Sequence, residues 1–242
     1  MRQIPLPISL PDRAIFDNYV PGSNLLLFNA LQDVFSVSYH DQQILLWSNY
    51  RVGKSHLLQS VCHLAAKKKK QIAYIPLQDL AALNPEILDD LEVLDAICID
   101  DLHLVVGDQE WATAFFRLIN ACRDKNTVLI MSSTVHPREM TLPFEDLRSR
   151  LLWGSVFHLK RLSDRDLLSS LYSRADEKGL EFPVDAAEFL VKRFARDTAE
   201  LLKFLDALDH ESMAQQRRIT IPLIKGVFWQ SKVKVKGFKR SL

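Results

Sequence analysis

The chain has 242 residues, of which 48% are hydrophobic and 25% charged, and this composition is typical of a globular protein. Its formal net charge of +1 argues against a broad nucleic-acid-binding surface. No apolar run reaches the roughly 18 residues of a membrane span, and prolines interrupt the N-terminus too early for a signal peptide. Cys62, Cys98 and Cys122 lie in apolar runs, so we expect reduced core cysteines in a soluble, cytoplasmic protein.

The first segment, residues 1–11, contains the stretch Gln3–Ile8, in which Pro5 and Pro7 alternate with large aliphatic residues. Proline lacks an N–H donor and disfavours helical geometry in the residue before it, so an extended segment is predicted. An extended apolar peptide is typical of a segment that another protein recognises. A tail packed on its own domain is the alternative, because so short a pattern arises easily by chance.

Residues 12–162 alternate short β-branched apolar runs with helically spaced apolar residues, which predicts parallel strands joined by helical crossovers. The expected fold is an α/β domain with a five-stranded parallel sheet and helices on both faces. The predicted strands are Ile44–Trp47, Ile72–Leu77, Ala96–Asp100, Val128–Thr134 and Val156–Lys160. The predicted helices include Ser55–Ala66, Trp111–Arg123 and a short one that carries Arg148 and Arg150.

After Leu162 the strand pattern stops, and residues 163–229 are predicted to form a small all-α domain. Ser163 is a suitable N-cap, and Asp166 follows it at the capping-box spacing. The predicted helices are Asp164–Lys178, Val184–Phe194, Thr198–Gln216 and Ile221–Trp229. Residues 230–242 form a basic tail, which is either solvated or in contact with nucleic acid.

Gly53-Lys54-Ser55 stands between a predicted strand and a predicted helix, which is the setting of a phosphate-binding loop. In such a loop, main-chain N–H groups and the helix N-terminus face the anion, while the lysine and serine serve phosphate and Mg²⁺. Ser48 replaces the first glycine of the motif, and Arg51 either crowds the phosphates or turns outward. The candidate nucleotide-binding residues are Ser48, Gly53, Lys54, Ser55 and His56.

Asp100 and Asp101 end an apolar strand, a pattern that indicates a metal site together with Ser55. The first carboxylate would hold the Mg²⁺ shell and the second would orient an attacking water. A strand that simply runs into an acidic turn is the alternative. The following strand ends with Ser132 and Ser133, which are candidate sensors of the terminal phosphate.

Arg148 and Arg150 lie on the short helix before the last predicted strand. Arginines there are either surface residues or groups that reach a nucleotide held by a neighbouring subunit. In the second case they would add positive charge against the transition state of phosphoryl transfer.

Together these motifs resemble the nucleotide-binding module of AAA+ proteins, and their spelling resembles the bacterial replication initiator DnaA. The likeness spans residues 12–229 and is carried by "FDNYVPGSN", "GKSHLL", "CIDDL", "RSRLLWG" and "RRITIPLIK". We expect no part of these 242 residues to correspond to the N-terminal helicase-contact domain or the C-terminal helix-turn-helix domain of DnaA. A DnaA-like module without them, preceded by a proline-containing peptide, resembles the Hda family, the regulatory inactivators of DnaA.

The resemblance implies roles for individual residues. In the Hda family the N-terminal peptide binds the sliding clamp of the replicative polymerase, and the matching residues here are Gln3, Ile4, Leu6, Pro7 and Ile8. The phosphate loop and metal site of the family match the residues named above, and its arginine finger, which acts in trans, matches Arg150. The sensor arginine of the family is replaced by Ala199, which weakens the case for hydrolysis by this chain.

The leading hypothesis is a regulator of replication initiation, without substantial ATPase activity of its own. It would bind the DNA-loaded sliding clamp, stimulate ATP hydrolysis by DnaA and so prevent re-initiation. The expected cofactor is ADP (or ATP) with Mg²⁺. The expected partners are the clamp and DnaA, with DNA reached through the clamp, a homodimer as a further option and no membrane. The alternatives are an active DnaA-like ATPase or loader, and a passive scaffold between clamp and initiator.

Overall fold

The structure is a computed structural model of the chain, and it describes residues 14–36, 42–80, 84–177, 179–194, 198–215 and 218–228. The predicted clamp-binding peptide (1–11) and the basic tail (230–242) therefore lie outside the described residues. The chain divides into two compact units, Met1–Lys160 and Arg161–Leu242, close to the boundary expected at Leu162. Each unit has its own hydrophobic core.

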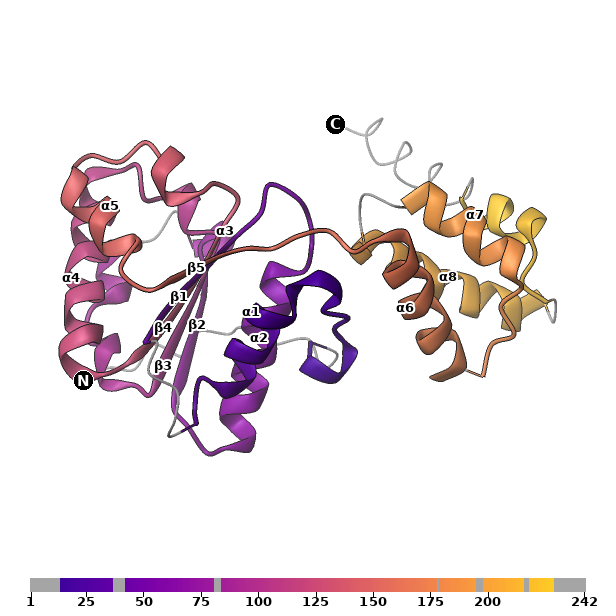
Figure 1. The fold of residues 1–242 in the computed structure, drawn as a ribbon, viewed down its shortest axis with the longest axis horizontal. Coiled ribbons are helices and arrows are strands. Elements are labelled where there is room, and N and C mark those ends of the chain that lie inside the picture. Colours follow the sequence, from indigo (N-terminus) through magenta and orange to yellow (C-terminus); the bar gives the residue numbers. More distant parts are fainter. Residues whose placement is uncertain are drawn as a thin grey trace. The chain divides into compact units, whose positions relative to one another are not determined.

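The first unit is built on a five-stranded sheet (Figure 1). Its strands are β1 (Gln43–Trp47), β2 (Ile72–Pro76), β3 (Ala96–Asp100), β4 (Val128–Ser133) and β5 (Ser155–His158). They lie in the order β2-β3-β4-β1-β5, and each neighbouring pair is parallel. The predicted parallel sheet is therefore confirmed, with β1 between β4 and β5.

Helices cover both faces of the sheet (Figure 1). Helices α1 (Leu25–Asp33) and α2 (Lys54–Lys67) pack on one face, and α4 (Gln109–Lys125) and α5 (Glu145–Leu151) pack on the other. The short helix α3 (Leu77–Leu80) follows β2 directly. Strand side chains alternate between the two cores, because successive residues of a strand point to opposite faces. Ile44 and Leu46 join the core under α2, whereas Leu45 joins the core under α4.

Helix α1 is absent from the elements predicted above, although Leu27 and Leu31 are buried at helical spacing. Helix α4 begins at Gln109, earlier than predicted, because Asp108 caps it. The Asp108 carboxylate accepts hydrogen bonds from the main-chain N–H groups of Glu110 and Trp111, at 2.9 and 3.1 Å.

The last strand was predicted to reach Lys160, but β5 ends at His158. The main chain of Lys160 makes its hydrogen bonds with a side chain, and not with the neighbouring strand. The Lys160 N–H donates to Asn24 Oδ1 at 2.8 Å, and Asn24 Nδ2 donates to the Lys160 carbonyl at 2.9 Å. Asn24 is buried, so this two-way contact fixes the end of the α/β unit.

The second unit is helical, as predicted, with α6 (Asp164–Glu177), α7 (Val184–Phe194), α8 (Thr198–Gln215) and a further helix over residues 221–228. The predicted cap is present: Ser163 Oγ accepts from the Asp166 N–H at 3.2 Å and donates to the Asp166 carboxylate at 2.7 Å. The buried side chains of the helices form one core, which includes Leu171, Leu190 and Leu205.

All three cysteines carry buried free thiols, as predicted. Burial raises the pKa of Cys98 well above its ordinary value, and it raises the pKa of Cys122 to about 12. Among the helices that the structure describes, none combines the length and the apolar character needed to cross a membrane.

Candidate nucleotide site

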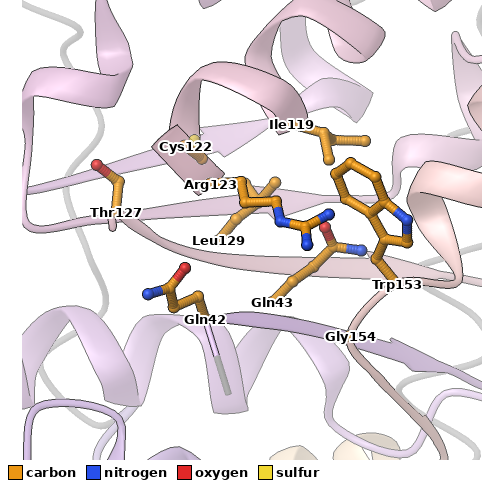
Figure 2. Close-up of a pocket in the computed structure, with 9 residues that line it drawn as sticks. All are labelled: Gln42, Gln43, Ile119, Cys122, Arg123, Thr127, Leu129, Trp153 and Gly154. Atoms are coloured by element: carbon orange, nitrogen blue, oxygen red, sulfur yellow. The ribbon is translucent and has the colours of Figure 1, made fainter. Parts of the chain in front are cut away.

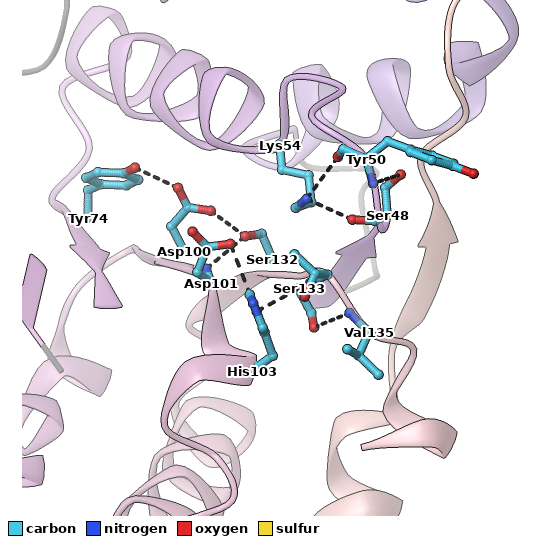
Figure 3. A network of polar contacts seen from close by, with 11 residues as sticks. Ser48, Tyr50, Lys54, Tyr74, Asp100, Asp101, His103, Ser132, Ser133 and Val135 are labelled. Atoms are coloured by element: carbon cyan, nitrogen blue, oxygen red, sulfur yellow. Dashed lines mark hydrogen bonds and ion pairs between the residues drawn. The ribbon is translucent and has the colours of Figure 1, made fainter. Parts of the chain in front are cut away.

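Polar side chains gather where β1, β3 and β4 end, at the carboxyl edge of the sheet (Figure 3). In open parallel sheets, ligands bind at this edge. The structure brings together residues that the sequence analysis had assigned to three separate motifs. They are Ser48 and Lys54 of the loop, Asp100 and Asp101 at the end of β3, and Ser132 and Ser133 of β4.

The loop after β1 has the backbone of a phosphate-binding loop at its last glycine. Gly53 adopts φ +89°, in the left-handed region, and a Cβ there would lie 2.9 Å from the ring of Tyr19. The Tyr19 hydroxyl donates to the Val52 carbonyl at 3.3 Å. No described side chain caps α2, whose first N–H groups lack intrahelical acceptors. The N-terminus of α2 is thus suited to an anion.

Lys54 points back to its own loop in this structure. Its Nζ donates to the carbonyls of Ser48 and Tyr50, at 2.9 and 3.3 Å, and only 9% of the residue is exposed. Burial lowers the pKa of Lys54, and the nearby carboxylates of Asp101 and Asp100 partly offset that effect. A bound phosphate would therefore have to replace these main-chain carbonyls as the partner of the Lys54 ammonium group.

Both carboxylate oxygens of Asp100 accept hydrogen bonds from hydroxyl groups (Figure 3). Tyr74 donates to Oδ2 at 2.9 Å, and Ser132 donates to Oδ1. Gln59 donates to the Tyr74 hydroxyl at 3.3 Å, and the Asp101 N–H donates to Ser132 Oγ at 2.9 Å. Ser132, a candidate sensor of the terminal phosphate, is fully buried, and its hydroxyl contacts Asp100.

Asp101 stands in the left-handed region at φ +59°, beyond the end of β3. Burial and the neighbouring Asp100 raise the pKa of Asp101, while His103 and Lys54 act in the opposite direction. Burial lowers the pKa of His103. The Thr134 N–H donates to His103 Nδ1 at 3.3 Å, and the same nitrogen lies 4.0 Å from Asp101 Oδ1.

The other predicted loop and sensor residues make contacts within the chain around the site. Ser133 is buried, its Oγ accepts from the Val135 N–H at 2.9 Å, and its carbonyl accepts from the Ser48 N–H at 3.1 Å. His56 Nε2 lies 3.0 Å from the Ile15 carbonyl. Arg51 is exposed, which favours the outward-turned alternative. Ala199 lies in α8, among residues whose side chains the structure does not describe.

The chemistry of this donor set fits Mg²⁺ held together with phosphates. Mg²⁺ typically takes one or two carboxylates plus substrate phosphates and waters, and not a cage of protein ligands. The described residues contain no cluster of three or more His, Cys, Asp or Glu side chains able to hold a metal by themselves. Asp100, Asp101 and the Ser55 hydroxyl would hold the ion, which would neutralise phosphate charge when bound.

Arg150 lies far from this site, at the amino edge of the sheet. Its carbonyl accepts a hydrogen bond from Gln43 Nε2 at 2.9 Å, and Gln43 is the first residue of β1. The phosphate loop follows the other end of β1, about 13 Å away at roughly 3.3 Å per strand residue. Arg148 is bound by two groups near it: its guanidinium donates to Glu145 of the same helix at 2.9 Å and to the Pro137 carbonyl, before that helix, at 2.6 Å.

Sequence reasoning missed three residues that organise these sites: Tyr19 beside Gly53, Tyr74 beside Asp100, and Trp153 beside Arg150. Tyr74 lies in a predicted strand, β2, and pairs with Cys98 of β3, which is two residues before Asp100. Local sequence patterns do not give the order of the strands in the sheet, so this pairing could not be predicted. Trp153 is three residues after Arg150, a spacing that places two side chains on one side of a helix end.

A parallel sheet with a phosphate loop and paired carboxylates at its carboxyl edge, followed by a small helical domain, defines a P-loop protein of the AAA+ class. Comparison with family models agrees: residues 10–158 match the bacterial DnaA ATPase domain, and residues 164–228 match the lid domain of Hda. The chain therefore belongs to the family of the bacterial DnaA ATPase domain, and its second domain is similar to the Hda lid. Its family connects it with DNA replication.

Solved structures show the same fold. Domain III of the Thermotoga maritima initiator DnaA superposes with a TM-score of 0.77 at 19% identity, covering 92% of this chain and 98% of that one. AMPPCP-bound DnaA from Aquifex aeolicus gives 0.72 at 18% identity, covering 82% and 66%. The Thermotoga maritima RuvB branch migration motor gives 0.65 at 17% identity, covering 84% and 66%.

Proposed function

We propose that this protein regulates replication initiation by binding the DNA-loaded sliding clamp and stimulating ATP hydrolysis by DnaA. Stimulated hydrolysis would convert the initiator to its ADP form and prevent a second initiation. In this proposal the N-terminal peptide docks on the clamp, and Arg150 enters the ATP site of DnaA. The two family matches support the proposal, because this chain joins a DnaA-like ATPase domain to a lid similar to that of Hda.

The position of Arg150 is the observation that carries the proposal. An arginine finger contributes by adding charge where it develops on the transferred phosphoryl group, an effect of about 10³–10⁵ in rate in the best cases. Arg150 is bound at the amino edge of its own sheet, one strand length from its own phosphate loop. It therefore cannot serve that loop, and a role in phosphoryl transfer requires a second protein's nucleotide.

We further propose that the chain binds ADP, or ATP, with Mg²⁺ but hydrolyses little on its own. Lys54 is bound to two loop carbonyls, and both Asp100 oxygens accept from hydroxyls. Rapid hydrolysis would need these groups to be rearranged around phosphate, metal and water together, and small misplacements are costly in rate. The alternative, an active ATPase, predicts steady-state turnover at an ordinary P-loop rate that Lys54→Ala abolishes.

The deciding experiment is ATP turnover by DnaA in the presence of clamp loaded on DNA, with and without this protein. Wild type should accelerate turnover, and Arg150→Ala should remove the acceleration. Arg148→Ala is the matched control, because the Arg148 guanidinium is held by Glu145 and the Pro137 carbonyl. Equal acceleration by wild type and Arg150→Ala would refute the finger and leave a scaffold role.

Clamp binding is tested separately by capture on immobilised clamp. Deleting residues 1–10 should abolish capture, and Gln3→Ala or the double variant Leu6→Ala/Ile8→Ala should weaken it without lowering the melting temperature. Two apolar anchors in a pocket account for most of the affinity of such a peptide, while prolines reduce the entropy lost on binding. Undiminished capture of the deletion variant would exclude the peptide as the clamp ligand.

A further inference from the structure

Arg150 is held at both its main chain and its guanidinium group by residues that have no assigned role. At the main chain, Gln43 Nε2 donates to the carbonyls of Arg150 and Leu151, at 2.9 and 3.2 Å. Carbonyls at a helix C-terminus lack intrahelical partners, so this side chain fixes the end of α5. The main-chain N–H of Trp153 also donates to the Arg150 carbonyl, at 3.2 Å.

The guanidinium group of Arg150 stacks on aromatic rings. Its Cζ lies 3.7 Å from the centre of the Trp153 ring and 5.4 Å from that of Phe116. Arg150 Nε is buried and has no hydrogen-bond partner among the described residues. Stacking, and not an ion pair, therefore sets the direction of this side chain.

Trp153 is itself fixed by a second arginine. Arg123, near the end of α4, places its Cζ 4.0 Å from the centre of the same ring. The two residues line a cavity of about 230 Å³ at the amino edge of the sheet, together with Gln43 and Gly154 (Figure 2). Trp153, although 40% exposed, is thus in contact with one arginine from α4 and one from α5.

We propose that Trp153 and Gln43 are positioning residues that hold Arg150 ready for the nucleotide of a partner. The inference rests on the proposed function of Arg150 in trans. A free arginine side chain loses much rotamer freedom when it enters a partner's site, whereas a stacked one has lost that freedom in advance. A cation–π contact of this kind corresponds to a factor of about 2 to 30, depending on how well it is shielded from water.

In the opposite arrangement, the contact with Trp153 would hold Arg150 away from the nucleotide of the partner. The two arrangements predict effects of opposite sign. If Trp153 positions Arg150, Trp153→Ala lowers the maximal rate of stimulated DnaA hydrolysis by about 2- to 30-fold. If Trp153 withholds Arg150, the same substitution raises that rate. An increase, or no change, overturns the proposal.

The experiment measures stimulated ATP turnover by DnaA against the concentration of this protein, with clamp loaded on DNA. Trp153→Ala should lower the maximal rate more than it changes the half-saturating concentration, and Trp153→Phe, which retains a ring, should restore most of the loss.

Gln42→Ala is the matched control for Gln43→Ala. Gln42 lines the same cavity, but its Nε2 donates to Asn126 Oδ1 at 2.6 Å and not to α5. Gln43→Ala should lower the stimulated rate and Gln42→Ala should not. If Arg150→Ala alone leaves stimulation intact, the proposed function fails. If Arg150→Ala abolishes stimulation while the Trp153 and Gln43 variants match wild type, only the positioning fails. Thermal melting of each variant identifies any loss caused by unfolding.

Discussion

Gly154 is the residue whose substitution should perturb the amino edge of the sheet most severely. It lies directly before β5, where the backbone runs against β1. A Cβ added there would lie 2.7 Å from both the carbonyl carbon and the Cβ of Gln43, and closer still to the Gln43 carbonyl oxygen. Non-bonded carbon atoms pack at about 3.5–4.0 Å, so Gly154→Ala requires a displacement of about 1 Å.

That displacement sets the size of the effect. Overpacking of this degree costs about 1–3 kcal/mol. The hydrogen bonds from Gln43 to Arg150 and Leu151, at 2.9 and 3.2 Å, would exceed the limit of a hydrogen bond after a shift of about 1 Å. Each is worth about 0.5–1.5 kcal/mol. We therefore expect Gly154→Ala to lower the free energy of unfolding of the first unit by about 2–6 kcal/mol.

Urea unfolding followed by tryptophan fluorescence measures this change, because Trp47, Trp111 and Trp153 all lie in the first unit. Gly107→Ala is the matched control, since a Cβ there would lie 3.5 Å from the Thr141 carbonyl, an ordinary contact. It should leave stability unchanged or raise it by about 0.4–1 kcal/mol. Equal stabilities for the Gly154 and Gly107 variants would refute the close approach of β5 to β1.

Three other predictions follow from the buried polar groups. Because burial and the neighbouring Asp100 raise the pKa of Asp101 in the folded state, its ionised form costs stability at neutral pH, and Asp101→Asn should stabilise the protein. In urea titrations that gain should shrink as the pH falls through the raised pKa, and it should be gone below about 3.9, the ordinary pKa of aspartate; a pH-independent gain would contradict this origin. Tyr74→Phe should lower the free energy of unfolding by about 1–3 kcal/mol, because Asp100 loses a hydrogen bond to a charged group, whereas an unchanged urea midpoint would contradict that contact. The three buried thiols should not react with Ellman's reagent until denaturant is added, and rapid reaction of the folded protein would show that a thiol is accessible.

The elements that sequence predicts well are those in which one local pattern decides the outcome. Ala96–Asp100 is fully buried, and its unbroken apolar run predicts strand β3 with the bounds that the structure has. Val184–Phe194 is likewise predicted with its observed bounds, because Pro183 precedes it and its apolar residues follow helical spacing. Bounds shift where a side chain competes with the pattern, as Asp108 does at α4 and Asn24 does at Lys160.

The candidate site shows a different limit of sequence reasoning. Motifs indicated Lys54, Asp100 and Ser132 as neighbours, since the carboxyl ends of parallel strands share one edge of the sheet. They could not indicate that Lys54 binds carbonyls of its own loop, or that a tyrosine from β2 donates to Asp100. Those contacts depend on rotamers and on the register of β2 against β3, which are properties of the assembled sheet.

The two edges of the sheet differ in how their charged groups are satisfied, and this difference favours a regulator over an independent ATPase. At the carboxyl edge, Lys54 and Asp100 have hydrogen-bond partners within the chain, so a nucleotide must replace or adjust those contacts to be hydrolysed. At the amino edge, Arg150 rests on an indole ring, and its Nε has no hydrogen-bond partner among the described residues. A guanidinium group held by stacking keeps its hydrogen-bonding capacity for an anion, because stacking uses the face of the plane and not its N–H edges. The Arg150 guanidinium is therefore the group best prepared to bind phosphate, although the phosphate loop of its own chain cannot use it.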